Sequence, residues 1–367
     1  MKYKLKDIGT ITTGKTPSKK IVGAYGKKIN FLTPRDLNGQ RYSEYTERRL
    51  SLKGIECLKN YEVIPPSISV SCIGSDMGKV VFNKTPIVTN QQLNSISNIR
   101  KDIDPLYLYY LLYNKRILLK FMGSDRGSTM PILSKREFGN LEFEFPNLKT
   151  QKSISSRLDS LDKKIEVNSR INDNLLDIAQ NIYHRILFSP QITKTNLRSF
   201  ATVVMGQSPS SKTYNENKIG IPLLNGAADF RNGIHPSKWT TDPKIIVNKG
   251  AYIFGVRATI GLTAKVSKSY AIGRGTGSAI PKDVKNEEIL YFILNDMFKK
   301  FEQTESGSVY INISKNDFEN YRFNIPDRNG LLFFHEKVKP IMDQIYIYKK
   351  QNKILQAIKA ALLSKIF

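Results

Sequence analysis

Residues 151–188 read QKSISSRLDSLDKKIEVNSRINDNLLDIAQNIYHRILF and contain neither glycine nor proline. Their apolar side chains recur at intervals of three and four, which is typical of an α-helix with one apolar stripe: Leu158, Leu161, Ile165, Ile171, Leu175, Ile178, Ile182 and Ile186. At about 1.5 Å per residue this stretch predicts a rod of roughly 57 Å, longer than an ordinary globular helix. A second such stretch, residues 331–367, ends the sequence.

The parts of the chain between these helices form an internal repeat. Residues 127–146 read GSTMPILSKREFGNLEFEFP and residues 307–326 read GSVYINISKNDFENYRFNIP, at a constant offset of 180. In both copies, alternating apolar residues at 141–145 and 321–325 predict half-buried strands. Residues 5–18 and 197–210 match at an offset of 192, and both end in a Gly-x-[ST]-Pro-Ser turn. Helices are expected at 106–122 and 287–303.

The offset of 180 continues into the long helices, which favours their packing on each other. Asn172 falls on Asn352, and an Asn in the core of a coiled coil sets register at a cost in stability. The alternative, an Asn on a solvent-facing edge, is equally compatible with the sequence. Pro340 falls where the first copy has Ser160, and predicts a kink or a helix start near residue 341. The residues expected to pair the helices are Leu158, Leu161, Ile165, Asn172, Leu175, Ile182, Ile341, Ile345, Asn352, Leu355 and Leu362.

The repeat predicts an α+β fold in which two related globular domains alternate with two long helices. We expect one domain at 1–149, the first helix at 150–190, the second domain at 191–329 and the second helix at 330–367. The helices should pack antiparallel as a coiled coil, with a pseudo-two-fold axis relating the halves. Such an arrangement suits a ligand that itself repeats, and duplex DNA read at two sites is the obvious case.

The charge of the chain favours a polyanionic partner. It carries 57 Lys and Arg against 32 Asp and Glu, and a net charge of +25, of which about +19 lies outside the two helices. The alternative is a solvated basic surface. No apolar run approaches the roughly 20 residues that a bilayer span requires, so we expect no membrane partner and a cytoplasmic protein. Cys57 and Cys72, the two cysteines, are expected to be free thiols that pack as small apolar residues.

Signs of catalysis in the sequence are weak. Residues 9–16, GTITTGKT, match the phosphate-binding pattern G-x-x-x-x-G-K-[ST], but Pro17 and Ser18 follow where that mechanism requires a helix. The second copy lacks both the first Gly and the Lys of the pattern. Three His and two Cys show no metal-ligand spacing, so no metal site is predicted. The sequence therefore favours a binding protein over an enzyme, with no catalytic residues of its own.

The order of these motifs resembles the specificity (S) subunits of type I restriction–modification systems. The resemblance is carried by the duplicated Gly-x-[ST]-Pro-Ser turn, by the Gly-Ser turn before a strand that ends in Phe/Ile-Pro, and by the helix that opens with Gln151, Ile154, Leu158 and Leu161. It covers essentially the whole chain. The second helix departs from it, because LLFFHEKVKPIMD lacks the Gln-x-x-Ile opening.

This resemblance implies two target-recognition domains that each read one half of a bipartite, asymmetric double-stranded DNA site. The helices would set the gap between the half-sites and dock two methyltransferase (modification) subunits. The partner would hold S-adenosylmethionine and methylate adenine N6, and a restriction/translocase subunit, where the system has one, would use ATP and Mg. The chain itself would bind no cofactor.

Sequence reading requires side chains at base edges, for which Arg, Asn and Gln are the strongest candidates, while Lys and Arg hold phosphates. Candidates in the first domain are Arg35, Asn38, Lys79, Asn90, Gln91, Arg126, Ser128 and Thr129. Those in the second domain are Asn225, Arg231, Asn232, Arg257, Thr259, Arg274 and Ser308. The sequence alignment places Arg274 opposite Asn90, and such differences imply different half-sites.

Three alternatives remain open at this point. One is the specificity subunit of a type IIB-like fused system, in which modification and cleavage share one polypeptide. Another is a P-loop nucleotide-binding protein, and the third is a coiled-coil scaffold that does not read DNA.

Overall fold

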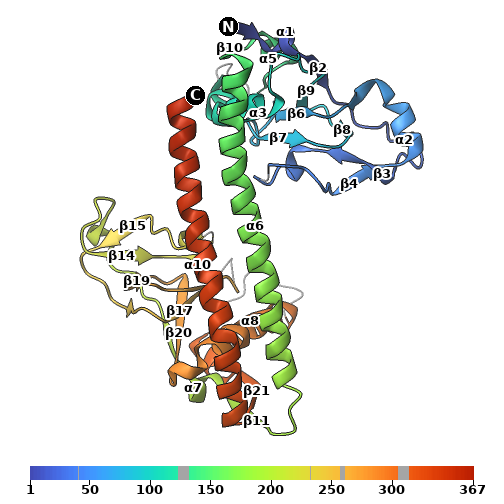
Figure 1. Ribbon diagram of the computed structural model, residues 1–367. Helices are drawn as coiled ribbons and strands as arrows, with labels where there is room; N and C mark the ends of the chain where they lie inside the picture. Colours follow the sequence, from blue (N-terminus) through green and yellow to red (C-terminus); the bar gives the residue numbers. More distant parts are fainter. Residues whose placement is uncertain (40, 123–131, 232, 257–260, 305–313) are drawn as a thin grey trace. The chain divides into compact units, whose positions relative to one another are not determined.

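The computed structural model describes residues 1–39, 41–122, 132–231, 233–256, 261–304 and 314–367. The chain forms two compact units: unit 1 is Met1–Val167 with Asn352–Phe367, and unit 2 is Asn168–Gln351. Each unit contains one globular domain together with a segment of each long helix, α6 (Leu148–Ile186) and α10 (Arg328–Ile366) (Figure 1).

Two four-stranded sheets form the domain of unit 1. The inner sheet has the order β2 (Thr10–Thr13), β9 (Leu93–Ser97), β6 (Ser67–Ser71), β7 (Val80–Asn83). The outer sheet has the order β4 (Arg48–Leu50), β3 (Tyr25–Leu32), β8 (Ile87–Thr89), β5 (Glu62–Val63). A third, antiparallel pair joins β1 (Lys2–Lys4) to β10 (Glu142–Glu144), and confirms the strand expected from the alternation at 141–145.

Short helices complete this domain: α1 (Leu5–Ile8), η1 (Pro34–Asp36), α2 (Leu52–Cys57), η2 (Lys59–Tyr61), α3 (Pro105–Asn114), α4 (Arg116–Met122) and α5 (Lys135–Asn140). The prediction of a single helix at 106–122 was wrong, because Lys115 has a ψ of 5° and separates α3 from α4. Asp104 caps α3 by accepting from the backbone N–H of Tyr107, and Pro105 occupies the first turn.

The inner sheet of unit 1 is buried on both faces. Ile68 and Val70 pack with α3 and the helical segments in the main core, whereas Val81 and Leu93 join a smaller core that the outer sheet closes. α2 then covers the far face of the outer sheet, where Phe31 and its neighbours form a third cluster. The domain is therefore layered, with helices, inner sheet, outer sheet and α2 in turn (Figure 1).

Unit 2 repeats this strand order and adds one strand at the edge of its outer sheet. Its inner sheet has the order β12 (Ala201–Met205), β20 (Thr276–Pro281), β17 (Tyr252–Gly255), β18 (Thr263–Lys265). Its outer sheet has the order β13 (Tyr214–Asn215), β15 (Lys238–Thr240), β14 (Ile221–Leu224), β19 (Tyr270–Ile272), β16 (Ile246–Val247). β11 (Ile192–Asn196) pairs with β21 (Arg322–Pro326), which confirms the second predicted strand.

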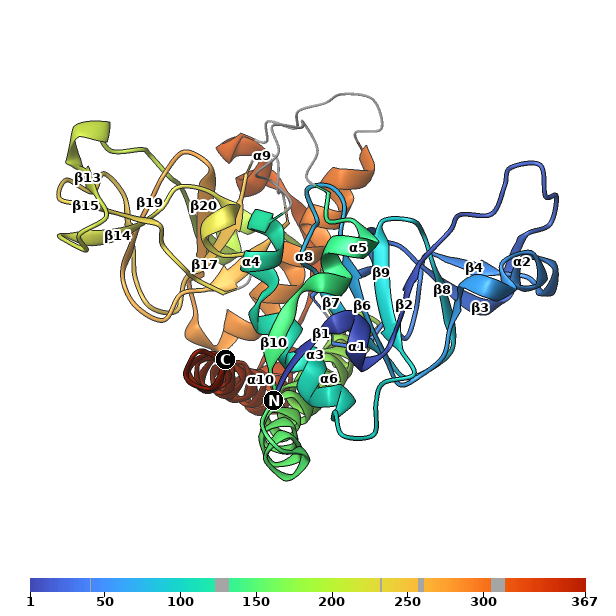
Figure 2. The same ribbon diagram turned by 90° about the horizontal axis from the view of Figure 1, so that it is seen from above.

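The helices of this unit are α7 (Leu197–Phe200), η3 (Ser211–Thr213), η4 (Ala227–Asp229), η5 (Val284–Asn286), α8 (Glu287–Thr304) and α9 (Lys315–Asn320). Alternate residues of β17 point to opposite faces, so Tyr252 and Phe254 join the core under α8 while Ile253 joins the core of the outer sheet. Figure 2 shows β13, β14 and β15 on the outer side of β17 and β20. Between β15 and β16 the described chain has no counterpart of α2.

Within each unit the two long helices run antiparallel. In unit 1 the Lys359 ammonium lies 2.7 Å from an Asp162 oxygen, and Asn352 Nδ2 donates to the Ile165 carbonyl at 3.2 Å. In unit 2 the amide of Asn168 donates to Gln351 Oε1 at 3.3 Å. α10 runs continuously through Pro340. The predicted start of this helix near residue 341 was therefore wrong. Pro340 is exposed, which lets water satisfy the carbonyl that loses its partner.

The buried side of the helices is more polar than the sequence pattern predicts. Ser155, Asp162, Asn168 and Asn172 are all buried, whereas Ile178 is about half exposed. Asn172 and Asn352 thus lie on buried sides of their helices rather than on a solvent-facing edge. Of the other residues expected to pair the helices, Leu158 and Ile345 are buried and the rest are half-buried: Leu161, Ile165, Leu175, Ile182, Ile341, Leu355 and Leu362.

A network of buried charges joins the domain of unit 1 to its helical segments. The Arg41 guanidinium contacts Asp159 at 2.5 Å and Asp162 at 3.5 Å, and its side chain is only 4% exposed. The Tyr110 hydroxyl on α3 donates to Asp162 at 2.8 Å, and Lys359 on α10 contacts the same carboxylate. Arg41 and Lys359 therefore balance Asp159 and Asp162, and the exposed Lys163 adds a further cation 2.9 Å from Asp159.

The corresponding joint of unit 2 is mainly aromatic. Tyr183 on α6 stacks on Phe292 of α8 with ring centroids 5.2 Å apart, and Phe334 of α10 meets Phe292 edge-on at 5.9 Å. One polar pair accompanies these rings, in which His335 Nδ1 lies 2.6 Å from an oxygen of the buried Glu288.

Candidate nucleic-acid interface

The outer sheet of each domain contains one parallel pair of strands. In unit 1, β3 and β8 run parallel with Leu32 opposite Thr89, and the N–H of Asn90 extends the ladder by donating to the Leu32 carbonyl at 3.0 Å. In unit 2, Leu224 of β14 lies opposite Ile272 of β19. Because the carboxyl ends of parallel strands meet at one edge, the loops that follow them start side by side.

An aspartate holds the first of these loops in each domain. In unit 1, Asp36 accepts from the N–H of Thr33 at 2.7 Å and from the N–H of Glu47 at 2.8 Å. In unit 2, Asp229 accepts from the N–H of Asn225 at 2.9 Å and from that of Ser237 at 3.3 Å. Both carboxylates therefore fasten the loop after the central strand to the residue before the next strand.

The sequence comparison missed these two aspartates. The loop of unit 2 is one residue longer between its strand and its aspartate, so an ungapped alignment does not superpose them. The Thr-x-x-Asp pattern at Thr33 was the available signal, since it is a capping box for the short helix η1.

The Gly-x-[ST]-Pro-Ser turn brings a third segment to the same edge. A Cβ atom on Gly14 would lie 2.1 Å from the Thr89 carbonyl oxygen, and one on Gly206 would lie 2.1 Å from that of Gly273. These glycines are required because the backbone passes directly over the second loop. The next residue, Lys15, bonds to Thr89 through its N–H, and no helix follows it, so the structure contradicts a P-loop.

Hydroxyl groups of these turns form hydrogen bonds with residues that are candidates for reading DNA bases. The Thr16 hydroxyl donates to Gln91 Oε1 at 2.7 Å. In unit 2, the Ser208 hydroxyl donates to Asn225 Oδ1 at 3.2 Å and accepts from the N–H of Arg274 at 3.1 Å. We call the edge of the outer sheet at which the two parallel strands end the strand-end edge. The structure thus brings Gln91 to the strand-end edge of unit 1, and brings Asn225 and Arg274 together at that of unit 2.

The backbone pairing corrects the sequence alignment by one residue. Lys15 N–H bonds to Thr89 and Gln207 N–H bonds to Ile272, so Thr89 and Ile272 are equivalent. Two positions further on, Arg274 is therefore equivalent to Gln91, and not to Asn90 as the alignment placed it.

The remaining predicted residues fall into three groups. Arg35, Asn38 and Arg231 are exposed in the loops that follow β3 and β14. Asn90 is only 8% exposed and bonds to Gln92 within its own turn, and half-buried Lys79 forms an ion pair with Asp76 at 2.8 Å. The others lie outside the described residues: Arg126, Ser128, Thr129, Asn232, Arg257, Thr259 and Ser308.

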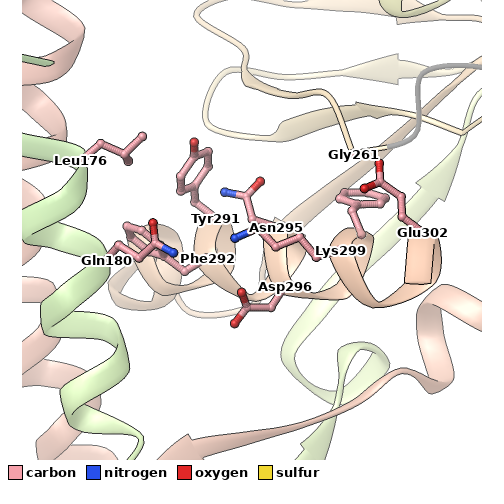
Figure 3. A pocket seen from close by; sticks show the side chains of 10 residues that line it. Leu176, Gln180, Gly261, Tyr291, Phe292, Asn295, Asp296, Lys299 and Glu302 are labelled. Atoms are coloured by element: carbon pink, nitrogen blue, oxygen red, sulfur yellow. The ribbon is translucent and has the colours of Figure 1, made fainter. Parts of the chain in front are cut away.

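Unit 2 also contains a small polar cavity between α6 and α8. Its volume is about 200 Å³, below the roughly 300 Å³ at which small-molecule sites begin. Figure 3 shows Gln180 from α6 and Asn295, Asp296 and Lys299 from α8 around it. The Tyr183 hydroxyl nearby bonds to Asp296, and burial is the main cause that raises the pKa of Tyr183. Its size argues against a nucleotide or S-adenosylmethionine there.

Among the described residues, no group of His, Cys, Asp and Glu could hold a metal ion, and no helix is long and apolar enough to cross a membrane. Cys57 and Cys72 are both free thiols. Burial raises the pKa of Cys72 to about 12, which suits an unreactive apolar role. Cys57 is exposed, so the expectation that both pack inside was wrong.

Comparison with known proteins identifies the family to which this chain belongs. The model of the type I restriction modification DNA specificity domain matches residues 1–176 and again residues 192–362. The chain belongs to this DNA specificity family. The MjaIX specificity subunit of a type I restriction enzyme from Methanocaldococcus jannaschii is 26% identical over 99% of this chain and 91% of its own length. The HindI specificity subunit from Haemophilus influenzae is 29% identical over 50% of this chain and 40% of its own.

One solved structure of a specificity subunit shares the fold of this chain. The type I restriction–modification S subunit from M. genitalium has a TM-score of 0.65, with 16% identity over all of this chain and 96% of that one. The match confirms the predicted fold of two tandem α+β domains with long helices.

Proposed function

We propose that this chain is the DNA-recognition subunit of a type I restriction–modification complex, with one half of a bipartite, asymmetric site read by each domain. The observation that carries the proposal is the double match to the specificity family, which falls on two domains of the same topology. The two matched edges differ in their side chains, and two different readers suit an asymmetric site better than a palindrome.

Exposed basic residues near the strand-end edges supply the charge that DNA binding requires. In unit 1, Lys15, Lys19 and Lys20 are exposed within and just after the Gly-x-[ST]-Pro-Ser turn. In unit 2, Lys212 follows the equivalent turn and is also exposed. Such side chains neutralise phosphates without reading sequence, and leave that task to Arg and amide side chains at the strand ends.

Docking of modification subunits on the long helices is supported by a repeated apolar feature. Val167 and Ile347, 180 positions apart, are both exposed, and so are Ile178 and Ile358 at the same spacing; the four are 44–49% exposed. A single exposed aliphatic residue means little, but its recurrence at equivalent positions suits a partner that binds twice. The partner would hold S-adenosylmethionine and methylate adenine, so this chain would catalyse nothing itself.

The proposal is tested by mapping methylated adenines across the host genome with and without this gene. We expect a bipartite motif that disappears when the gene is deleted and returns with a plasmid copy. A motif that survives deletion would contradict the function. Purification of the tagged chain from the same cells separates the type I form from a fused type IIB-like system, because the latter yields modification and cleavage domains in one polypeptide.

A further inference from the structure

The two strand-end edges carry different side chains at one equivalent position. Backbone bonds superpose Thr89 on Ile272, which makes Gln91 and Arg274 equivalent. Both side chains are exposed, in contrast to the buried Asn90 that precedes the first. Each also lies only two residues after the end of a parallel strand, so its backbone is held by the sheet rather than by a long loop.

In unit 1 the Thr16 hydroxyl determines how the amide of Gln91 is turned. It donates to Oε1 at 2.7 Å, and the carboxamide oxygen has a second lone pair, while Nε2 keeps both of its protons. An amide held in this way can accept from N6 of adenine and donate to N7 at the same time. It matches no other base edge in the major groove equally well.

In unit 2 the hydroxyl acts on the backbone instead of the side chain. Ser208 Oγ accepts the N–H of Arg274 at 3.1 Å and donates to Asn225 at 3.2 Å. The turn therefore fixes the start of the Arg274 side chain and leaves its guanidinium exposed. Two N–H groups of a guanidinium match O6 and N7 of guanine.

Building on the DNA-recognition function proposed above, we propose that Gln91 and Arg274 are the equivalent base-reading residues of the two domains. Gln91 reads an adenine in one half-site, and Arg274 reads a guanine at the corresponding place of the other. Thr16 and Ser208 are positioning residues that act through them.

The test exchanges the two chemistries in the native gene and maps methylated adenines genome-wide. In cells with Gln91→Arg, we expect one adenine of one half-site to become guanine, with methylation of the original motif reduced roughly 10- to 100-fold. Arg274→Gln should convert one guanine to adenine in the other half-site only. Gln91→Ala should relax the same position to several bases, while the second half-site remains unchanged and reports that the chain is folded.

Several results would overturn the inference without touching the proposed function. They are an unchanged motif, a change in both half-sites, or complete loss of methylation in both Gln91→Arg and Gln91→Ala while deletion of the gene still abolishes the wild-type motif. Failure of the function itself is different, because the wild-type motif would then persist after deletion.

The positioning role of Thr16 has its own readout. Thr16→Val removes the hydroxyl at nearly constant volume, and we expect the Gln91 position to accept additional bases while the other positions of the motif stay strict. Thr16→Ser should restore discrimination. Equal relaxation of every position in the half-site would show that Thr16 supports the domain as a whole.

Discussion

The two recognition domains share a backbone design but are joined to the helices by different chemistry. Both domains share the order of their common strands and one parallel strand pair. In both, a glycine also lets the backbone of the turn pass directly over the second loop. The joint of unit 1 is a buried charge network around Asp162, whereas that of unit 2 is a cluster of rings around Phe292. Features set by the backbone therefore match between the two domains, whereas the side-chain contacts that join each domain to the helices differ.

The largest effect is expected in the aromatic joint. Phe292→Ala should destabilise unit 2 by about 4 kcal/mol, because it removes a buried ring that contacts both Tyr183 and Phe334. Phe292→Leu retains most of the apolar volume and should cost less than half of that. Hydrogen exchange of α8 measures the effect. Equal exchange in both variants would contradict this account, because it would show that the apolar volume retained by Leu contributes nothing.

The charged joint should be almost as sensitive. Asp162→Ala leaves Lys359 and Arg41 with one fewer partner in a buried site, and should destabilise unit 1 by about 3 kcal/mol. Asp343→Ala is the matched control, since its ion pair with Lys339 is exposed and should contribute less than about 1 kcal/mol. Urea unfolding compares the two, and similar losses would contradict a special role for the buried network.

The shared backbone design is tested by its glycines. Gly14→Ala and Gly206→Ala each place a Cβ about 2.1 Å from a carbonyl oxygen, and each should cost about 2 to 3 kcal/mol in its own unit. Hydrogen exchange of β8 and β19 reports the loss. A large effect in one unit and none in the other would break the structural equivalence of the two turns.

The smallest effect concerns pH. Burial opposes ionisation of Asp159, but bonds to Lys163 and Arg41 outweigh it and hold the pKa of this carboxyl below its ordinary value. The unfolded chain therefore binds this proton first, at about pH 4, so the contribution of Asp159 is complete above that pH and is lost as the pH falls further. Asp159→Asn should remove about 1 kcal/mol of stability at pH 7 and reduce the acid dependence. An unchanged acid slope would contradict this assignment.

Much of the architecture follows from local patterns that the sequence displays. The long helices, the strands before each of them and the repeat itself depend on periodicity and on turn residues, which act over a few positions. The polar residues on the buried side of the long helices could not be predicted from such patterns. Asp162 is stabilised there by Lys359, almost two hundred positions away in the chain. Continuity of α10 through Pro340 likewise depends on which side of that helix is exposed.

The candidate interface was predictable only in outline. Arg and amide residues after apolar strands indicated loops whose residues Gln91, Asn225 and Arg274 the structure places at the strand-end edges. Their pairing could not be read from an ungapped alignment, because insertions shift the offset between the copies from 192 to 183 within one domain. Asn90 looked like an equally good reader, yet its side chain completes its own turn.

A structure of the chain with its modification subunits on a duplex that carries the methylated motif tests the central claim most directly. We predict that Gln91 and Arg274 contact base edges in the major groove of separate half-sites, an adenine and a guanine respectively. DNA bound away from the strand-end edges, or both residues within one half-site, would contradict it.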